Sequence, residues 1–169
     1  MKQSILRFCF LILACCLVGL AQAQPYQTAV GLRLGYPTSL SAKTFLSETK
    51  AVEAHIGTRG GYRYQWFNFS AALLHQQPME IDGLEHLTWY AGAGASIYLW
   101  SYDQTWFGRE TYGTTSLGIQ GYLGTEYSLE EYDIPLAISI DWVPTVFLGG
   151  YTRGFGGRHY TLGVRYLLR

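Results

Sequence analysis

The sequence contains no cysteine beyond residue 16, because its only cysteines are Cys9, Cys15 and Cys16. It also contains little charge: Asp, Glu, Lys and Arg make up 14% of the residues, and the formal net charge at pH 7 is zero. Beyond the first 23 residues, no apolar run is long enough to cross a bilayer as a helix. These absences exclude disulfides, thiolate catalysis and cysteine-ligated metals from residues 24–169. No basic surface typical of nucleic-acid binding is expected either.

Residues 1–23 have the pattern of a cleaved signal peptide. Lys2 and Arg7 form a positive start, residues 8–20 form an apolar run too short to span a bilayer, and the sequence AQA at 21–23 matches a cleavage site. We therefore expect residues 24–169 to form the mature domain. Its ten basic and twelve acidic residues give a net charge of −2.

The segment 89–100, WYAGAGASIYLW, shows the clearest periodicity in the remaining chain. Every second residue from Trp89 to Leu99 is apolar, and the residues between them are small in the middle, with Tyr90 and Tyr98 at the edges. This period of two predicts a β-strand with two unlike faces. Twelve residues, tilted by about 45°, rise about 28 Å, enough to cross the apolar band of a bilayer.

Similar alternating segments, separated by turn signals, recur along the chain and indicate an all-β protein. Their length of roughly ten residues is typical of a closed, antiparallel, eight-stranded, up-and-down transmembrane β-barrel. We expect Pro144 to end the seventh strand, and we expect loops at 76–87, at the aromatic segment 101–113 and at the glycine-rich segment 145–157. The predicted strands are 27–36, 39–46, 51–58, 62–75, 89–100, 115–127, 135–143 and 158–168.

Three observations favour a barrel whose apolar face points outward. An eight-stranded barrel has too little interior space for bulky side chains from every strand. The polar face is richer in Gly and Ala than the surface of a soluble protein. Aromatic residues gather near the strand ends, as they do at membrane interfaces. The alternative is a soluble periplasmic barrel that binds an apolar small molecule in a cavity lined by Leu32, Ile56, Ile97, Leu117 and Ile140.

The inward assignment places seven ionisable side chains in the lumen. Three basic residues balance three acidic ones, and buried charges need partners. We interpret the set as a salt-bridge network that fills the barrel, and a polar path for solutes or protons is the alternative. The predicted lumen residues are Arg33, Lys43, Glu53, His55, Glu126, Asp141 and Arg165.

The sequence predicts no enzyme and no cofactor or metal. Ser139, Asp141 and His55 share the inward face, which leaves a hydrolase as an alternative, but no motif sets their spacing. The other histidines, His75, His86 and His159, lie near predicted strand ends and are expected to be solvated or interfacial. No His spacing typical of metal sites is present. The aromatic residues of 102–112 are expected to form an interfacial belt, with a partner, glycan or lipid contact as the alternative.

With its strands assigned, the chain resembles the small eight-stranded outer-membrane barrels of the OmpA/OmpX type. It looks closest to a group of uncharacterised small barrels that share the stretches GLRLGYP at 31–37, WYAGAG at 89–94 and SIDWVP at 139–144. The resemblance implies a fold and a membrane but no site residues. Barrels of this type usually end on an aromatic residue, whereas the last aromatic here is Tyr166, three residues before the end. A periplasmic N-terminus would place loop 76–87 on the periplasmic side and turn 37–38 outside.

We therefore expect a monomeric, porin-like protein in the outer membrane of a Gram-negative-type cell envelope, with a structural or surface-interaction role. Its expected partners are outer-membrane lipid, the barrel-insertion machinery and periplasmic chaperones. A narrow transport or apolar-ligand-binding barrel and a membrane-embedded lipid or peptide hydrolase are the alternative functions.

The leader assignment predicts that the mature chain begins at Gln24. Intact-mass measurement of protein recovered from the cell envelope should give the mass of residues 24–169 without lipid. The alternative is a lipoprotein cut before Cys15, although Leu13 stands where a small residue is usual. A lipid-modified chain starting at Cys15 would contradict the prediction.

Overall fold

The computed structural model describes residues 26–61, 64–102, 112–150, 152–157 and 159–168. The predicted leader 1–23 and its cleavage site lie outside these residues. The described chain is almost entirely β-structure, with one short 3-10 helix, η2 (Glu130–Tyr132). Its strands are β1 (Thr28–Gly35), β2 (Thr38–Ser47), β3 (Lys50–Gly61), β4 (Tyr64–Pro78), β5 (Leu87–Tyr102), β6 (Tyr112–Ser128), β7 (Leu136–Trp142), β8 (Thr145–Gly149), β9 (Gly154–Gly156) and β10 (Tyr160–Leu168).

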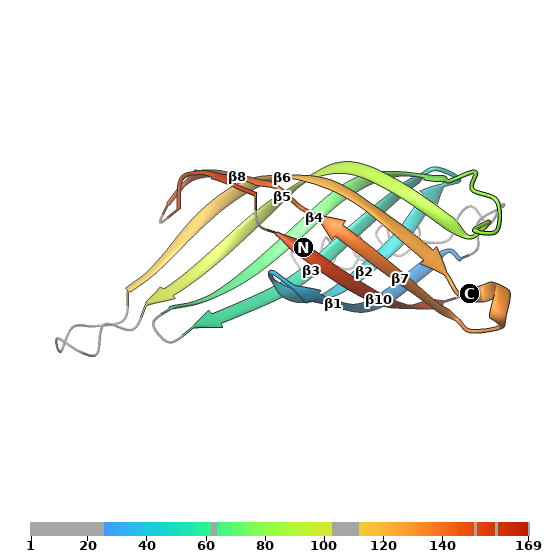
Figure 1. Cartoon of the computed structure of the whole chain (residues 1–169). Coiled ribbons are helices and arrows are strands. Elements are labelled where there is room, and N and C mark those ends of the chain that lie inside the picture. Colours follow the sequence, from blue (N-terminus) through green and yellow to red (C-terminus); the bar gives the residue numbers. More distant parts are fainter. Residues whose placement is uncertain (1–25, 62–63, 103–111, 151, 158, 169) are drawn as a thin grey trace, which may run out of the picture.

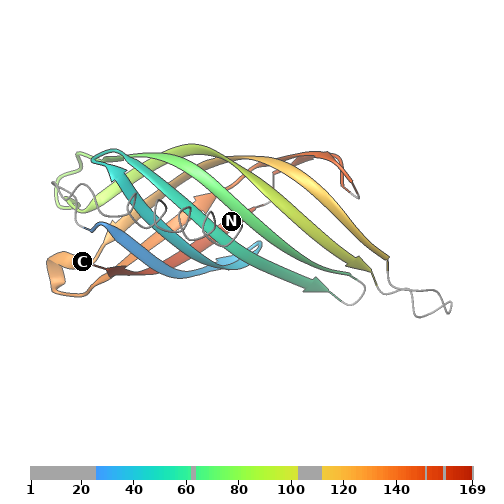
Figure 2. The same ribbon diagram turned by 180° about the vertical axis from the view of Figure 1, so that it is seen from behind.

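Eight strands close into a ring, as Figures 1 and 2 show from opposite sides. β1 pairs with β2 on one side and with β10 on the other, and the pairing of β5 with β6 completes the circuit. Every ladder is antiparallel, and β1 to β7 follow one another around the wall. The predicted all-β, closed, eight-stranded antiparallel barrel is confirmed. Closure pairs the strand edges that an open sheet would leave exposed.

The prediction of a loop at 145–157 was wrong, because this segment contains β8 and β9. β8 continues β7 along β6: Leu123 pairs with Trp142 and Gln120 pairs with Thr145, so the register does not shift across the break. Pro144 interrupts the strand without ending it there. It lacks an N–H group, but its carbonyl oxygen accepts a hydrogen bond from the Gly121 N–H at 2.9 Å.

β9 pairs with β8 on the edge away from β6, just as β10 pairs with β7 on the edge away from β6. Tyr160 pairs with Trp142, whereas Gly156 pairs with Thr145, so the chain carries one residue more between β9 and β10 than between β7 and β8. The seventh and eighth barrel strands are therefore each broken near mid-height. The Gly-rich composition of 145–157 masked this continuation, because glycine is typical of both turns and irregular strands.

Several strands also extend beyond their predicted ends. β3 reaches Gly61, β4 reaches Pro78, β5 reaches Tyr102 and β6 begins at Tyr112. The expected loops 76–87 and 101–113 are correspondingly shorter, since antiparallel pairing between long neighbours continues into them. The remaining part of the aromatic segment, residues 103–111, lies outside the described residues.

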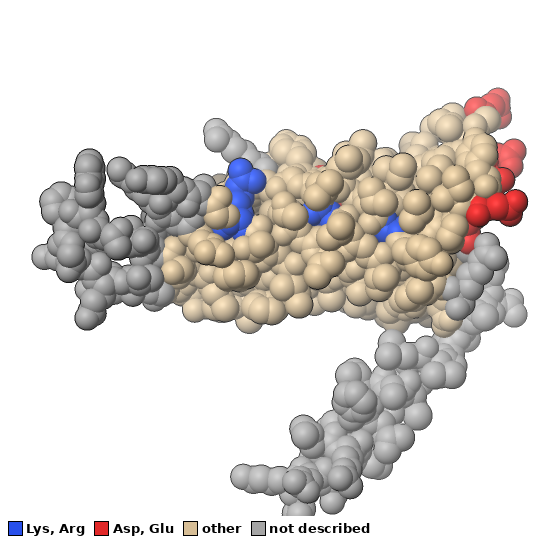
Figure 3. All heavy atoms as spheres, turned by 90° about the horizontal axis from the view of Figure 1, so that it is seen from below, with Lys and Arg blue, Asp and Glu red and all other residues tan. Residues whose placement is uncertain are grey.

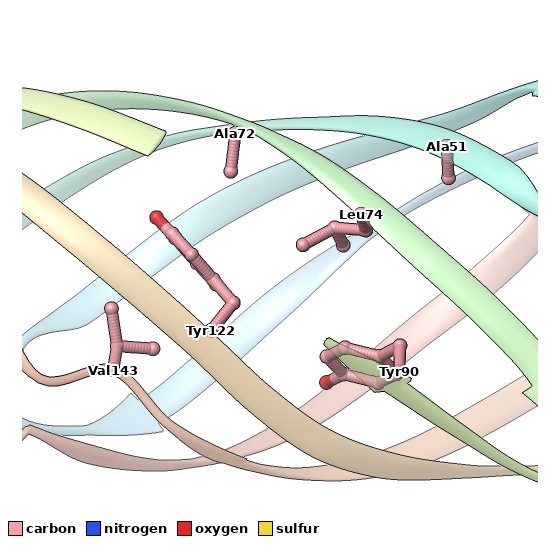
Figure 4. Packing of buried hydrophobic residues seen from close by; sticks show 6 residues of the cluster. All are labelled: Ala51, Ala72, Leu74, Tyr90, Tyr122 and Val143. Carbon is pink, nitrogen blue, oxygen red and sulfur yellow. The ribbon is translucent and has the colours of Figure 1, made fainter. Parts of the chain in front are cut away.

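The two faces of the wall differ as the alternation indicated. The exposed side chains on the outer face are mainly apolar, and Leu40, Leu73 and Ile140 are each more than 60% exposed. The inner face carries charged, hydroxyl and aromatic side chains that are buried in the barrel. One inward cluster, shown in Figure 4, consists of Ala51, Ala72, Leu74, Tyr90, Tyr122 and Val143.

The two ends of the barrel differ in charge. The end that carries Thr28 and Leu168 also carries the turn at 48–49, the loop 79–86 and the turn 129–135, and we call it the terminus end. Acidic side chains gather there (Figure 3). The turn at 36–37 and the outer parts of β3, β4, β5, β6, β8 and β9 lie at the opposite end, which we call the loop end. The segments 76–87 and 37–38 thus lie at opposite ends. The acidic residues of the terminus end are Glu48, Glu80, Asp82, Glu85, Glu130, Glu131 and Asp133.

The closing seam between β1 and β10 depends on a glycine. A Cβ atom at Gly31 would lie 2.1 Å from the Val164 carbonyl oxygen and 2.5 Å from the Arg165 Cα atom. Because both atoms belong to the backbone, Gly31→Ala must separate the strands. We expect a loss of about 1–3 kcal/mol in the free energy of unfolding, measured by urea titration in detergent micelles.

Gly149→Ala is the matched control, since a Cβ atom there meets nothing within 4 Å. Equal stability of the Gly31→Ala and Gly149→Ala proteins would contradict the close approach of β1 and β10.

Candidate functional site in the barrel lumen

The seven predicted lumen residues all point into the barrel, and each is at most 5% exposed. They come from six of the eight strands around the ring. β1 supplies Arg33, β2 Lys43 and β6 Glu126, while the other four are Glu53 and His55 from β3, Asp141 from β7 and Arg165 from β10. Alternation places them inward because each lies on the polar row of its strand. The barrel then brings together residues up to 112 positions apart in the chain.

Arg165 is at the centre of the network. Its Nη2 atom lies 2.9 Å from Glu53 Oε1, and its Nη1 atom lies 2.7 Å from Glu126 Oε2. Nη1 also donates a hydrogen bond to Ser139 Oγ at 2.9 Å. One guanidinium thus joins carboxylates from β3 and β6, on well-separated parts of the wall. Planar guanidinium groups suit such divided contacts better than the compact ammonium group of lysine.

Arg33 forms the part of the network nearer the loop end. Its guanidinium contacts Glu53 Oε1 at 3.3 Å and Asp141 Oδ2 at 3.1 Å. Nη2 donates to Thr161 Oγ1 at 3.0 Å, and Thr161 Oγ1 donates onward to Asp141 Oδ2 at 3.0 Å. Glu53 is therefore shared between Arg33 and Arg165, which makes the lumen charges one connected group.

His55 lies beside Arg33, with 3.1 Å between its Nδ1 atom and Arg33 Nη1. An arginine has only donors, so Nδ1 is the acceptor in this pair. The imidazole proton is then on Nε2 and the ring is neutral. His55 acts here as a hydrogen-bond acceptor that adds no charge, so the three cations and three anions of the lumen stay in balance.

Lys43 and Glu126 lie toward the terminus end. Lys43 Nζ is 3.1 Å from both oxygens of Glu126, and it also donates to Gln76 Oε1. Glu126 Oε1 accepts a hydrogen bond from the Tyr26 hydroxyl at 2.5 Å. The ammonium group lies 4.7 Å from the ring centroid of Tyr90, which adds a cation–π contact.

An aromatic layer fills the lumen nearer the loop end. Trp66, Tyr98 and Phe147 are buried there, with Tyr36 and Trp100 packed against them. His159 stacks on Tyr36 with 5.1 Å between ring centroids, and its Nδ1 atom is 3.0 Å from Thr145 Oγ1. The expectation that His159 is solvated or interfacial was wrong, since it is 5% exposed. His159 is separated from Thr161 and Arg165 by an even number of positions, so the alternation of the strand could have placed it on the same inward face.

Sequence analysis also missed polar partners of the network. Tyr26, Gln76, Ser139 and Thr161 hydrogen-bond to its charged members, but Tyr26 precedes the first predicted strand and Gln76 was assigned to a loop. Alternation places Ser139 and Thr161 on the inward rows of their strands, but nothing in the sequence pairs them with Arg165 and Asp141. Among the histidines, His75 and His86 are solvent-accessible, and His86 Nε2 lies 3.6 Å from Glu131 Oε2. The Tyr127 hydroxyl donates to Glu131 and lowers the pKa of that carboxyl.

The lumen has little free space beneath the turn at 36–37. A cavity of about 10 Å³ lies there, lined by Arg33, Ser39, His55, His159 and Thr161 among others. This volume has room for about one water molecule.

The arrangement also bears on catalysis and metal binding. Ser139 contacts Arg165 and His55 contacts Arg33, and among the described residues no hydrogen bond joins the serine to the histidine. The same part of the chain holds no group of three or more His, Cys, Asp or Glu residues suited to a metal ion. It also holds no helix that is long and apolar enough to span a membrane.

Comparison with known proteins gives one informative similarity. No family model and no curated protein sequence matches the chain. Its fold is similar to that in the crystal structure of Neisserial surface protein A (NspA), with a TM-score of 0.62 over 83% of this chain and 93% of that one. The sequence identity is 13%, so the similarity is one of fold.

The network predicts a large penalty for removing its central cation. Arg165→Met removes one of the two cations that pair with each of the buried carboxylates Glu53 and Glu126, and we expect a loss of about 3–5 kcal/mol in the free energy of unfolding in micelles. Lys50→Met, at an exposed lysine, is the matched control and should change stability by about 0.5 kcal/mol or less.

A double-mutant cycle tests the coupling within the network. Glu53→Gln should cost less in the Arg165→Met background than in the original protein, because the carboxylate has already lost a partner. Additive effects of the two substitutions would contradict the shared ion pairs.

Proposed function

We propose that the protein is a monomeric outer-membrane β-barrel with a structural or surface-interaction role and no catalytic activity. The observation that carries this proposal is the reversal of polarity across the wall. Ion pairs lie inside, while exposed apolar side chains from β1 to β8 and from β10 form the outer face. A soluble protein would leave this continuous apolar surface in water, where it favours aggregation.

The distribution of charge supports a membrane orientation. In Figure 3 the visible side of the barrel wall carries few charged residues, and acidic side chains gather at the terminus end. A periplasmic N-terminus would assign the end that carries Thr28 to the periplasm, although the loop 79–86 at that end is longer than the short periplasmic turns usual in outer-membrane barrels. The terminus end would face the periplasm, with its acidic turns in water, and the loop end would face outward. Outer-membrane lipid, the insertion machinery and periplasmic chaperones are the partners implied by this placement.

The lumen favours a filled barrel over a transport channel. Charged groups near the middle pair with one another, and aromatic rings occupy the space nearer the loop end. Because the network contains three cations and three anions, the lumen has no excess charge of one sign that would select cations or anions. Ser139 bonds to Arg165 and His55 bonds to Arg33, and the lack of a hydrogen bond between the serine and the histidine among the described residues supports a non-catalytic role. If either variant, Ser139→Ala or His55→Ala, abolished a hydrolysis that the original protein performs, a catalytic role would replace this proposal.

Two measurements test the membrane assignment together. Expressed protein should be recovered in the outer-membrane fraction and should migrate differently in gel electrophoresis with and without boiling. In planar bilayers we expect no stable conductance. Recovery as a soluble periplasmic protein would overturn the proposal, and steady channel currents would favour the transport alternative.

The outward face offers a sharper test. Leu32→Arg places a charge on the lipid-facing side of β1 and should destabilise the barrel by about 2–4 kcal/mol in a bilayer. Glu80→Arg, at an exposed position in the loop 79–86 of the terminus end, is the matched control and should have little effect. A soluble barrel with this fold would tolerate both substitutions, because residue 32 would then face water.

A further inference from the structure

The wall of the barrel is uneven at the loop end. β1 ends at Gly35 and the chain turns back at Tyr36 and Pro37, whereas β3 runs on to Gly61 and pairs there with β4 alone. On the other side of the short turn, β9 pairs with β8 alone among the described residues. We call this gap, bounded by β9, residues 59–61 of β3 and the turn at 36–37, the notch. Figure 1 shows the β1–β2 turn ending well short of its neighbours.

The hydrogen-bond pattern shows which backbone groups face the notch. The bond from the Gly121 N–H to the Pro144 carbonyl sets the alternation between β6 and β8, so that Thr145 and Phe147 bond toward β9. Their partners are Gly156 and Gly154. In an antiparallel ladder the residue between two bonded residues directs its N–H and C=O to the opposite edge. Both groups of Phe155 therefore face the notch.

The same argument applies to β3. The bond from the Gln76 N–H to the Thr49 carbonyl fixes the alternation between β3 and β4. Residues 59 and 61 then bond toward β4, and the backbone groups of Gly60 point to the edge where β2 has already ended. Within the part of the chain that the structure describes, the notch thus has an open backbone position on each side.

These open positions lie beside an apolar surface. Phe155 is 70% exposed and shares an outward row with Val146 and Ile119, which are also exposed. Unpaired backbone groups at the level of lipid are costly. Given the membrane placement under Proposed function, on which this inference rests, a strand that bonds to Phe155 would remove that cost.

A second copy of the chain does not fit this role. Two antiparallel strands from identical chains are related by a two-fold axis perpendicular to their sheet. The wall of a barrel in a membrane stands along the membrane normal, so this axis lies in the membrane plane. One copy would then be upside down relative to the other. Two copies with the same orientation are related by an axis along the membrane normal, and their strands, each tilted by about 35–45°, would then cross without forming a ladder.

The charge around the notch indicates the chemistry of the occupant. Arg59 is exposed, its guanidinium lies 4.1 Å from the Tyr36 ring centroid, and Nη1 donates to the Gly35 carbonyl at 3.4 Å. Arg153, next to β9, is also exposed. Among the described residues, every acidic side chain belongs to the lumen or to the terminus end, so none neutralises this pair.

We propose that the notch binds an extended, acidic peptide segment of another protein, which adds to β9 as a further strand. The backbone of the segment bonds to Phe155, and its carboxylates meet Arg59 and Arg153. Binding through an exposed sheet edge gives affinity from main-chain hydrogen bonds and selectivity from the flanking charges.

A backbone-modified peptide tests the proposal. The probe is a fluorescein-labelled peptide of alternating threonine and valine with glutamate at both ends, titrated with the full mature barrel in zwitterionic micelles and followed by fluorescence anisotropy. Methylating the backbone nitrogens along one edge of the peptide removes its ladder donors, and we expect affinity to fall about tenfold or more. Equal binding of the methylated peptide, or no binding of the parent peptide, would overturn the proposal.

Protein variants and lipid complete the test. Arg59→Gln should weaken binding several-fold, whereas Glu131→Gln, at the terminus end, should leave it unchanged; equal effects of the two would overturn the proposal. Nanodiscs of phosphatidylcholine should preserve binding. Loss of binding when phosphatidylglycerol is added would assign the notch to a lipid phosphate and overturn a peptide occupant. Gel mobility with and without boiling, measured on the same samples, separates a failed barrel from a failed notch.

Discussion

The shared ion pairs of Arg165 are the interaction on which the interior depends. A closed barrel removes every charged lumen side chain from bulk water, so each charge must find its partner across the ring. Arg165 joins Glu53 to Glu126, Glu53 joins Arg165 to Arg33, and Glu126 joins Arg165 to Lys43. Opposite walls are therefore linked by charged hydrogen bonds in addition to the ladders. The network also sets the polarity of the molecule, because a lumen filled with charge leaves the apolar faces of the strands outside.

The wall itself combines regular and interrupted regions. β4, β5 and β6 pair over long, unbroken ladders, while the seventh and eighth strands are broken near Pro144 and near Gly157. The short β1–β2 turn adds to this unevenness and leaves the notch at the loop end. The exposed arginines Arg59 and Arg153 lie at the loop end, and the acidic turns lie at the terminus end.

Sequence reasoning recovered the strand order and the inward row because alternation is a local property. The inward direction of Arg33, Lys43 and Glu53 follows in each case from the alternation along a single strand. The partners of these residues did not follow, since pairing Arg165 with Glu53 requires the register around the whole ring. His159 and the segment 145–157 were misjudged for a related reason. Glycine and proline signal a break, but only the continuing register on β6 shows that the strand resumes beyond it.

The sequence by itself determined the period-two pattern, the opposed apolar and polar rows and the balance of the lumen charges, since these depend only on residue types and their spacing. Tertiary structure decided which charges meet, where the ring closes and which strand edges stay open. The physical reason is that closure couples all strands at once. A register shift of one residue anywhere would exchange inward and outward rows on that strand, and no single strand contains the information that excludes it.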